Sequence, residues 1–364
     1  MPTIFLTGFP GFLGSALVER LLDRTPQETT LSCLIQPRWR GLAEQKAFSL
    51  ERQKTTRIGR IRLVEGDITH PGLGLGDNYT SLQEETVEIY HLAAVYDLSV
   101  KREFAFRVNV EGTRNVLDFA EGCNNLSRFQ YVSTCYVSGR YEGVFTEQDL
   151  EKGQRFNNFY EETKYLAEVE VQRRMKAGLP VTIYRPGIVV GDSKTGQTQK
   201  YDGPYAILRF LMGQLSLAVM PVIGNTKSFT VNIVPQDFVI ESIAYLSAQA
   251  TSVNKVYQLA NPSPPTVSAL IDLFAGAVHR LVVPVPLPKM LVKTALEYVP
   301  YAQDLTGITT DAVEYFTHPT TYTSENTLND LKDTNISCPP LEAYVGTMVQ
   351  YVQNHPDISP KAMV

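Results

Sequence analysis

Residues that bind metals or form disulfides are scarce in this sequence. Among its 364 residues there are four cysteines, five histidines and one tryptophan, and the cysteines stand apart at Cys33, Cys123, Cys135 and Cys338 without a C-x-x-C pair. Such spacing offers neither a zinc site nor a disulfide framework. We therefore expect no bound metal and a reducing, cytoplasmic environment.

Clusters of positive charge and long hydrophobic runs are also missing. The formal net charge is -5 and no run of five basic residues occurs, which argues against nucleic acid as a partner. The most apolar late segment, 281–300, is interrupted by Pro284, Pro286 and Pro288 and by two lysines, so it cannot span a bilayer. We expect a loop and a helix there, packed on the body. The chain opens on an apolar segment rather than a basic leader, so no signal peptide is expected.

What the sequence does contain is a glycine-rich turn at its start. An apolar run ends at Thr7, the segment T-G-F-P-G-F-L-G covers 7–14, and a helical pattern follows. In this context backbone N–H groups and a helix N-terminus can hold a pyrophosphate. Gly8 permits the tight turn, Gly11 the approach of the phosphates and Gly14 the packing of helix on strand. The spacing differs from G-x-G-x-x-G, so this segment taken alone is also compatible with a glycine-rich turn that binds no cofactor.

Short apolar strands then alternate with helical patterns through the first half of the chain, which predicts an α/β fold with a Rossmann-type doubly wound parallel sheet. After residue 191 the regularity weakens, and the tail from about 263 reads as helices and loops. We expect an NAD(P)-binding domain over 1–190 and a smaller, mainly substrate-binding lobe over 191–364, with 231–248 returning to the main domain. Strands are predicted at 31–35, 61–64, 87–92, 128–132, 181–184 and 231–234, helices at 108–120, 160–176, 205–214 and from 237, and a flap at 192–203.

Three side chains that suit carbonyl chemistry follow in order. The predicted strand 128–132 leads to Thr134, and Tyr160 and Lys164 are four residues apart, so they share one helix face. A lysine ammonium favours the phenolate form of a neighbouring tyrosine, and a threonine hydroxyl can donate to a carbonyl oxygen as negative charge develops there. We predict that these three residues are catalytic. Lys164 can also hold the nicotinamide ribose.

The order of these motifs resembles the extended short-chain dehydrogenase/reductase family. The matching segments are T-G-x-x-G-F-L-G at 7–14, G-D-I at 66–68, H-L-A-A at 91–94, N-V-x-G-T at 109–113, V-S-T at 132–134, Y-x-x-x-K at 160–164 and R-P-G at 185–187. Within the family the chain looks most like the thioester-reductase and fatty acyl-CoA reductase branch. That likeness rests on Y-V-S-T at 131–134, V-N-I-V-P-Q-D at 231–237 and C-P-P-L at 338–341.

The resemblance implies a set of cofactor contacts. Asp67 would meet the adenine, Ala93 and Ala94 would line the cofactor cleft, and residues 186–189 would lie near the nicotinamide amide. The implied cofactor-binding residues are Thr7, Gly8, Gly11, Phe12, Leu13, Gly14, Asp67, Ile68, Ala93, Ala94, Asn109, Lys164, Pro186, Gly187, Ile188 and Val189.

The residues after the second strand predict which cofactor is used. An acidic residue there would hold a ribose 2′-hydroxyl, whereas arginine accommodates a 2′-phosphate. The chain has Q-P-R-W-R at 36–40 with no carboxylate, which favours NADPH, with Arg38 as the first candidate for the phosphate contact and Arg40 as the second. Relatives with this contact often carry arginine at the position of Gln36.

Four other residues invite a functional interpretation. We expect His91, at a strand end, to be packed rather than to act as a base. We expect Asp237 to cap a helix, although a substrate role stays open. Cys135 lacks a histidine partner in the sequence, which disfavours a nucleophile. Tyr201 and the segment 205–212 offer apolar surface that could line a pocket or simply pack.

The sequence therefore predicts an NADPH-dependent reductase of a carbonyl or acyl thioester on an apolar substrate, carried on coenzyme A or an acyl carrier protein. The protein would be a monomer or homodimer. A sterol- or ketone-type alcohol dehydrogenase with the same three residues, a sugar-nucleotide epimerase or dehydratase, and a non-catalytic dinucleotide sensor remain as alternatives.

Overall fold

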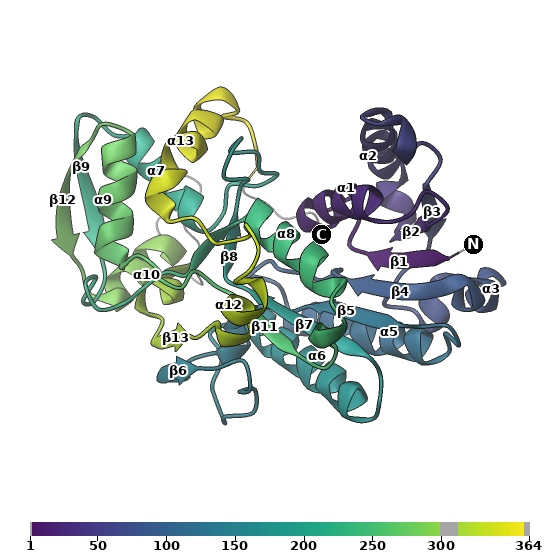
Figure 1. The fold of residues 1–364 in the computed structure, drawn as a ribbon. Helices are drawn as coiled ribbons and strands as arrows, with labels where there is room; N and C mark the ends of the chain where they lie inside the picture. The colour runs from purple at the N-terminus through teal and green to yellow at the C-terminus, as the bar shows by residue number, and fades with distance from the viewer. Residues whose placement is uncertain (1, 299–311, 360–364) are drawn as a thin grey trace.

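The computed structural model describes residues 2–298 and 312–359, which form a central parallel sheet with a smaller lobe beside it (Figure 1). Within them the sheet has the order β3-β2-β1-β4-β5-β7-β11, and each adjacent pair is parallel. Because β1 lies between β2 and β4, the carboxyl ends of β1 and β4 border the crevice where such sheets bind ligands. The strands are β1 (Thr3–Thr7), β2 (Thr30–Ile35), β3 (Ile61–Glu65), β4 (Thr86–His91), β5 (Arg128–Val132), β7 (Val181–Pro186) and β11 (Val256–Leu259).

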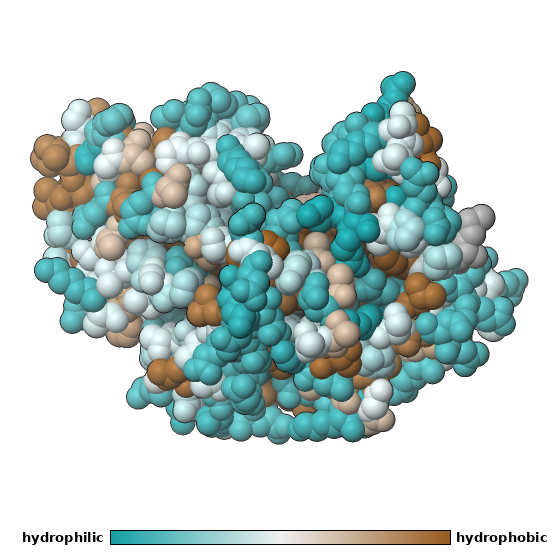
Figure 2. Space-filling model, viewed as in Figure 1, coloured by the Kyte–Doolittle hydropathy of each residue, from teal (hydrophilic) through white to brown (hydrophobic). Residues whose placement is uncertain are grey.

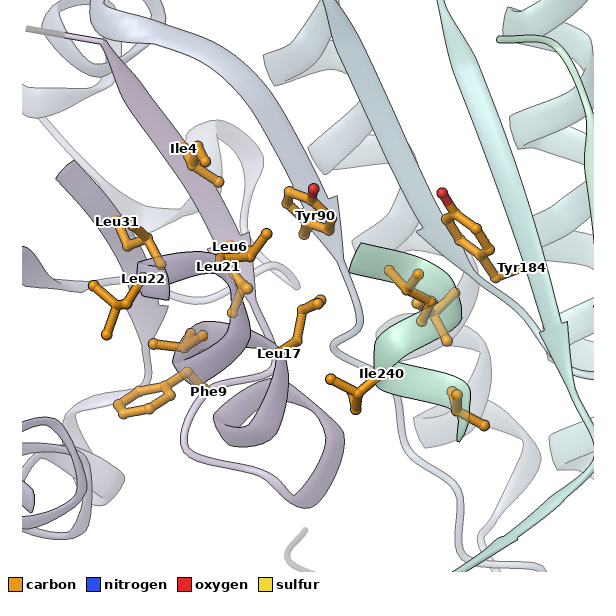
Figure 3. Close-up of a cluster of buried hydrophobic side chains, with 14 of the residues drawn as sticks. Ile4, Leu6, Phe9, Leu17, Leu21, Leu22, Leu31, Tyr90, Tyr184 and Ile240 are labelled. Atoms are coloured by element: carbon orange, nitrogen blue, oxygen red, sulfur yellow. The ribbon is translucent and has the colours of Figure 1, made fainter. Parts of the chain in front are cut away.

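Helices cover both faces of the sheet because successive strand residues point to opposite sides. Ile4 and Leu6 of β1 pack with residues of α1 and α8, whereas Phe5 packs with residues of α5 and α6. Figure 3 shows Leu17 of α1 and Ile240 of α8 on the first of these faces. The helices around the sheet are α1 (Phe12–Arg24), α2 (Arg40–Arg52), α3 (Asn78–Glu85), α4 (Arg102–Ala105), α5 (Gly112–Glu121), α6 (Phe159–Lys176) and α8 (Gln236–Ser247).

The lobe has a hydrophobic core of its own. In this core, buried apolar side chains of four elements pack together: α7 (Pro204–Met212), α9 (Val267–Ala277), α13 (Val345–Asn354) and β9 (Leu217–Val222). Short strand pairs join the chain's later segments to earlier ones, since β10 pairs with β8 and β13 with β6. The remaining elements are β6 (Gly143–Phe145), β8 (Ile188–Val190), β10 (Ile233–Pro235), β12 (Leu281–Pro286), β13 (Thr320–Tyr322), α10 (Lys289–Tyr298) and α12 (Glu325–Leu331).

The predicted Rossmann-type fold is confirmed, with small shifts at element ends. The helix expected at 108–120 begins earlier, since α4, a π-helical segment (Phe106–Glu111) and α5 follow one another without a break. The strand expected at 231–234 is β10, two residues later, and the next helix begins at Gln236 rather than residue 237.

The expectation of a loop and helix over 281–300 is wrong in its first half. Residues 281–286 form β12, which pairs in parallel with β9, and α10 follows; residues 299 and 300 lie outside the described residues. Prolines are tolerated there because β12 has an open edge within the described residues. The outer face of this pair exposes Leu217, Val219 and Leu281. Figure 2 shows hydrophobic residues at the left edge of the molecule, where Figure 1 places β9 and β12. Across residues 2–298 and 312–359, no helix has both the length and the apolar character needed to cross a membrane.

Candidate active site

The glycine turn between β1 and α1 leaves no room for larger side chains. Gly8 has a φ of +98°, and a Cβ on it would lie 3.0 Å from the backbone nitrogen of Ala93. A Cβ on Gly14 would lie 2.3 Å from the Gly8 carbonyl oxygen, and one on Gly11 would lie 2.8 Å from it. Helix α1 starts at Phe12, and no described side chain caps its N-terminus. This close turn fits the pyrophosphate of a dinucleotide.

Hydrogen bonds of Thr7 tie the turn to the end of β4. Its hydroxyl lies 2.7 Å from His91 Nδ1 and accepts from the backbone N–H groups of Leu92 and Ala93 at 3.2 and 3.1 Å. His91 Nε2 lies 3.0 Å from the Thr113 hydroxyl. Burial, with a smaller effect of nearby Lys164, lowers the pKa of His91 to about 3. The histidine is therefore packed and neutral, as expected.

Asp67, which follows β3, is linked by hydrogen bonds to the residues that follow β2. Its Oδ2 accepts from Gln36 Nε2 at 2.8 Å, and its Oδ1 accepts from the Thr69 N–H at 2.8 Å. Arg38 donates to Gln36 Oε1 from Nε and Nη2 at 2.8 and 2.6 Å. Arg40 instead pairs with two carboxylates, those of Glu44 and Glu65, at 2.8 and 2.7 Å. Arg38, which contacts a neutral amide here, is the better candidate for a phosphate.

Most of the remaining predicted cofactor residues lie at or after the carboxyl ends of strands of the central sheet. Asn109 is buried and exchanges two hydrogen bonds with the backbone of Val95, at 2.8 and 3.0 Å, so it positions the loop after β4. Its amide also donates to the Thr163 hydroxyl at 3.0 Å. Gly187 is confined, since a Cβ there would lie 2.6 Å from Asn232 Oδ1. Ile68 follows β3, Leu13 lies in α1, Ala94 follows β4, Pro186 ends β7, and Ile188 and Val189 lie in β8.

The predicted catalytic hydroxyls meet at the crevice. Thr134 follows β5, and Tyr160 lies in the first turn of α6, whose N-terminus is capped by Asn158 through a 3.0 Å bond from the Glu161 N–H. The side chain of Thr134 lies beside that of Tyr160. Burial raises the pKa of Tyr160 to about 12, and hydrogen bonding by Thr134 opposes this rise. Tyr160 is therefore a protonated hydrogen-bond donor at neutral pH.

The Lys164 ammonium is held at the end of β5. It donates to the Val132 carbonyl oxygen at 2.8 Å and to the Tyr131 hydroxyl at 3.1 Å. Burial lowers the pKa of Lys164 to about 8, and Glu168 partly offsets the effect. The ammonium thus lies one turn of α6 beyond Tyr160, and it is the site's group that titrates nearest to neutral pH.

A buried ion pair that we did not predict from the sequence lies behind the end of β5, the strand that leads to Thr134. Glu168 and Arg185 both have 0% side-chain exposure, and Arg185 Nη2 lies 2.6 Å from Glu168 Oε1. The Ser133 hydroxyl donates to Glu168 Oε2 at 2.5 Å. This pair joins β5, α6 and β7 directly behind Thr134. Its sequence signal was a glutamate one helical turn after Lys164, on the same face.

Aromatic rings form a wall next to Thr134. The Tyr136 N–H donates to the Thr134 hydroxyl at 3.2 Å, and the Tyr136 ring lies 4.7 Å from the ring of Tyr315 and 5.0 Å from that of His318. The Tyr315 hydroxyl accepts from Asn158 Nδ2 at 3.2 Å. The C-terminal part of the chain therefore reaches the start of α6, which sequence order alone did not indicate.

The cysteine beside Thr134 has no nucleophile environment. Cys135 is buried, its thiol donates to the Arg185 carbonyl oxygen at 3.0 Å, and burial raises the pKa of this thiol. A thiol that holds its proton is a poor nucleophile. In the part of the chain that the structure describes, no group of three histidine, cysteine or acidic residues is placed to hold a metal ion.

The lobe corrects the expectation for Asp237 and decides between the two alternatives left open for Tyr201 and 205–212. Asp237 does not cap α8, since the N-cap position is Pro235; its carboxylate accepts from the N–H and hydroxyl of Ser193 at 2.9 and 2.6 Å. The segment 205–212 largely packs inside the lobe rather than lining a pocket, because its bulky side chains belong to the lobe core. Tyr201 is buried there too and donates to the His355 carbonyl oxygen at 2.8 Å.

Comparison with known proteins identifies the family. An NAD-binding family model described as male sterility protein matches residues 6–243. The chain belongs to this family. The resemblance to the thioester-reductase and fatty acyl-CoA reductase branch of the extended short-chain dehydrogenases is thereby confirmed.

Members of this family occur as parts of larger proteins. The chain is 31% identical over 276 residues to a linear gramicidin synthase of Brevibacillus parabrevis, covering 73% of this chain and 5% of the synthase. It is 26% identical to the fatty acyl-CoA reductase wat of Drosophila melanogaster, covering 66% of this chain and 53% of that protein. The terminal R domain of the myxalamid PKS-NRPS pathway superposes with a TM-score of 0.81 at 27% identity, covering 98% of this chain and 91% of that domain. The chain thus spans about half of the insect relative and a small part of the synthase.

Proposed function

We propose that the chain is an NADPH-dependent reductase acting on a carbonyl or acyl thioester of an apolar substrate. The observation that carries the proposal is the pair of Thr134, which follows β5, and Tyr160, which lies beside it in the first turn of α6. It stands at the carboxyl end of the parallel sheet, on the side of the glycine turn. Relatives named as fatty acyl-CoA reductases and an aldehyde reductase support the same reaction class.

The two hydroxyls act on the oxygen of the substrate. When bound, NADPH would supply the hydride that reduces the carbonyl carbon. Thr134 and Tyr160 donate hydrogen bonds to the oxygen as negative charge develops on it. Tyr160 then transfers its proton to that oxygen, which its pKa of about 12 favours over loss of the proton to water.

A thioester gives a hemithioacetal at this stage. The Tyr160 phenolate takes the hydroxyl proton back, the carbonyl re-forms as an aldehyde, and the carbon–sulfur bond breaks. The leaving sulfur takes a proton from solvent, so one proton is consumed for each thioester reduced to an aldehyde and a thiol. Lys164 would hold the ribose of the cofactor. Its ammonium contacts the Tyr131 hydroxyl rather than that of Tyr160, so it does not lower the pKa of Tyr160 as expected.

The preference for NADPH rests on Arg38. Its guanidinium contacts the Gln36 amide and lies 5.6 Å from the ring centroid of Trp39. Neither contact is a carboxylate, so the positive charge of Arg38 is not neutralised by them and can meet a 2′-phosphate. Through Gln36 the same contact reaches Asp67, the residue expected at the adenine. Arginine is suited to this role because its planar fork binds phosphate in a bidentate manner.

The substrate would arrive as a thioester on coenzyme A or on a carrier domain. Support comes from the fatty acyl-CoA reductases among the relatives and from a solved thiolation-reductase di-domain, which shares the fold at 22% identity and a TM-score of 0.75.

A substrate screen tests the proposal. Purified protein is assayed for NADPH oxidation with decanoyl-CoA, decanal and a decanone, in wild type and in Tyr160→Phe. Conversion of UDP-glucuronate is followed separately by chromatography in the presence of NAD. We expect turnover of the thioester and the aldehyde, and a loss of about 10²–10⁴ in rate in Tyr160→Phe with the cofactor still bound.

The matched control is Tyr165→Phe, which removes a hydroxyl group from the same helix and should keep wild-type activity. The Tyr165 ring packs on the Phe156 ring, with the two ring centroids 5.0 Å apart. Near wild-type activity in Tyr160→Phe contradicts the assignment of the proton donor. Turnover of the ketone alone favours the alcohol dehydrogenase. Epimerisation consumes no NADPH overall, so a new epimer of the sugar nucleotide on the chromatogram is the result that favours the epimerase.

A further inference from the structure

Tyr131 contacts the Lys164 ammonium, although the proposed reaction gives this tyrosine no role. It lies in β5 and is 1% exposed. Its hydroxyl oxygen accepts a hydrogen bond from Lys164 Nζ at 3.1 Å, and the same nitrogen lies 4.6 Å from the centroid of the Tyr131 ring. Both the hydroxyl oxygen and the ring face therefore stabilise the positive charge of the lysine.

The hydrogen bonds of the ammonium use two of its three N–H groups. One N–H donates to Tyr131, and a second donates to the Val132 carbonyl oxygen at 2.8 Å. Within residues 2–298 and 312–359 these are the acceptors of Lys164, so one N–H is left for a ribose hydroxyl of the cofactor. Val132 contributes a backbone atom. Tyr131 therefore supplies the side-chain contact that a substitution can remove.

The Tyr131 ring is supported by the ring of His91, whose orientation is fixed at both nitrogens. The Thr7 hydroxyl accepts from two backbone N–H groups, so its own proton goes to His91 Nδ1, 2.7 Å away. The Thr113 hydroxyl donates to the Asn109 carbonyl oxygen at 2.6 Å, so it accepts from His91 Nε2 at 3.0 Å. Both ends place the histidine proton on Nε2. The centroids of the His91 and Tyr131 rings lie 5.7 Å apart.

Three other ionisable side chains surround Lys164. His91 faces it from β4, and Tyr160 and Glu168 lie one turn before and after it on α6. With a pKa of about 3 for His91 and about 12 for Tyr160, neither changes charge at working pH. Glu168 raises the pKa of Lys164 and is itself paired with Arg185 of β7. The change of charge at about pH 8 therefore belongs to Lys164.

We propose that Tyr131 is a positioning residue, whose hydroxyl oxygen holds the Lys164 ammonium at the end of β5 for its contact with the cofactor ribose. The inference rests on the proposed function and adds to it a residue that acts through the lysine. A hydrogen bond to a charged group favours the charged form, so Tyr131 also keeps the lysine protonated to higher pH.

The test follows NADPH affinity against pH in wild type and in Tyr131→Phe. The variant keeps the ring beside Lys164 and removes only the acceptor. Loss of a hydrogen bond to a charged group should lower the pKa of Lys164 by about one unit, from about 8. We therefore expect Tyr131→Phe to bind NADPH nearly as tightly as wild type at about pH 6, where both lysines are protonated. Above about pH 8.5 its binding should be weaker by about tenfold.

Tyr184→Phe is the matched control on the neighbouring strand β7. Tyr184 is 0% exposed, and its hydroxyl donates to Gln130 Oε1 at 2.9 Å, on the face of the sheet that packs against α1 and α8. Its affinity relative to wild type should not vary with pH. Urea unfolding confirms that both variants are folded at each pH used. A pH-independent affinity ratio for Tyr131→Phe, or the same pH-dependent ratio in both variants, overturns the proposal.

The activity profile is a second measurement, and the affinity measurement separates this proposal from the proposed function. In Tyr131→Phe the falling limb of kcat/KM for decanoyl-CoA should move from about pH 8 to about pH 7. An unmoved limb in an active variant overturns the role of Tyr131. NADPH binding requires no turnover, so an affinity ratio that falls with pH supports this role even if no thioester or aldehyde is reduced. A constant ratio refutes it even if thioesters are reduced.

Discussion

Replacing Glu168 by glutamine should destabilise the protein strongly, although the new side chain has the same shape. The carboxylate meets Arg185 through three contacts, from Nε at 3.0 and 3.2 Å and from Nη2 at 2.6 Å. Both side chains have 0% exposure. In Glu168→Gln the Arg185 guanidinium keeps its charge in the same buried position but loses the carboxylate that balances it.

The size of the effect follows from what Arg185 retains. Its other acceptors are the Asp149 carbonyl oxygen at 2.8 Å and that of Thr146 at a long 3.4 Å. Breaking a buried pair on one side costs about 3–5 kcal/mol, and the amide oxygen of glutamine still accepts one hydrogen bond, which places the loss at about 3 kcal/mol. That is a large part of a typical unfolding free energy of roughly 5–15 kcal/mol.

Urea unfolding followed by far-UV circular dichroism measures this loss. Glu170→Gln is the matched control on the same helix, because its ion pairs with Arg114 and Arg173 lie at the surface, where each is worth at most about 1 kcal/mol. A second variant, with Glu168 and Arg185 both replaced by methionine, should recover most of the lost stability, since no charge is left unpaired. Equal losses in Glu168→Gln and Glu170→Gln would refute the reasoning.

Three further predictions concern catalysis. Arg38→Ala should reduce NADPH affinity about tenfold or more without weakening NADH, whereas Arg40→Ala should leave both nearly unchanged; dissociation constants from fluorescence titration decide, and tighter binding of NADH by wild type contradicts the assignment. Activity should fall as pH rises through about 8, because Lys164 loses its proton there, and Glu168→Gln should move this limb of the kcat/KM profile to lower pH; an unmoved limb excludes Lys164 as its source. Efficiency should rise with acyl chain length, by up to about fourfold for each buried methylene, and a flat series would argue for a small polar substrate.

The sheet was predictable because its strands are short segments rich in β-branched, aromatic and other apolar residues, separated by helical patterns. Segments 87–92 and 128–132 became β4 and β5 with little change at their ends, although each also contains polar or charged residues. The glycine turn and the spacing of Tyr160 and Lys164 were equally local signals. The approach of Tyr160 to Thr134 follows from them once α6 packs against the turn after β5.

Contacts between distant segments were not predictable in this way. β12 was missed because prolines suggest a loop, and its partner β9 lies some sixty residues earlier in the chain. The helix 204–212 has an apolar face, but periodicity cannot say whether that face meets a substrate or the lobe core. Glu168 meets Arg185 only because α6 packs against β7. Its position one helical turn after Lys164 was visible in the sequence, but its full burial beside an arginine was not.

The ionisable groups of the site differ in a way that simplifies its pH dependence. Burial lowers the pKa of His91 to about 3 and raises that of Tyr160 to about 12, so neither changes charge under ordinary assay conditions. Lys164, with a pKa of about 8, lies between them. His91 is therefore uncharged at all working pH values, and its hydrogen bonds with Thr7 and Thr113 do not change with pH. A pH profile of this protein should consequently report the lysine, while the histidine contributes only the shape of the crevice.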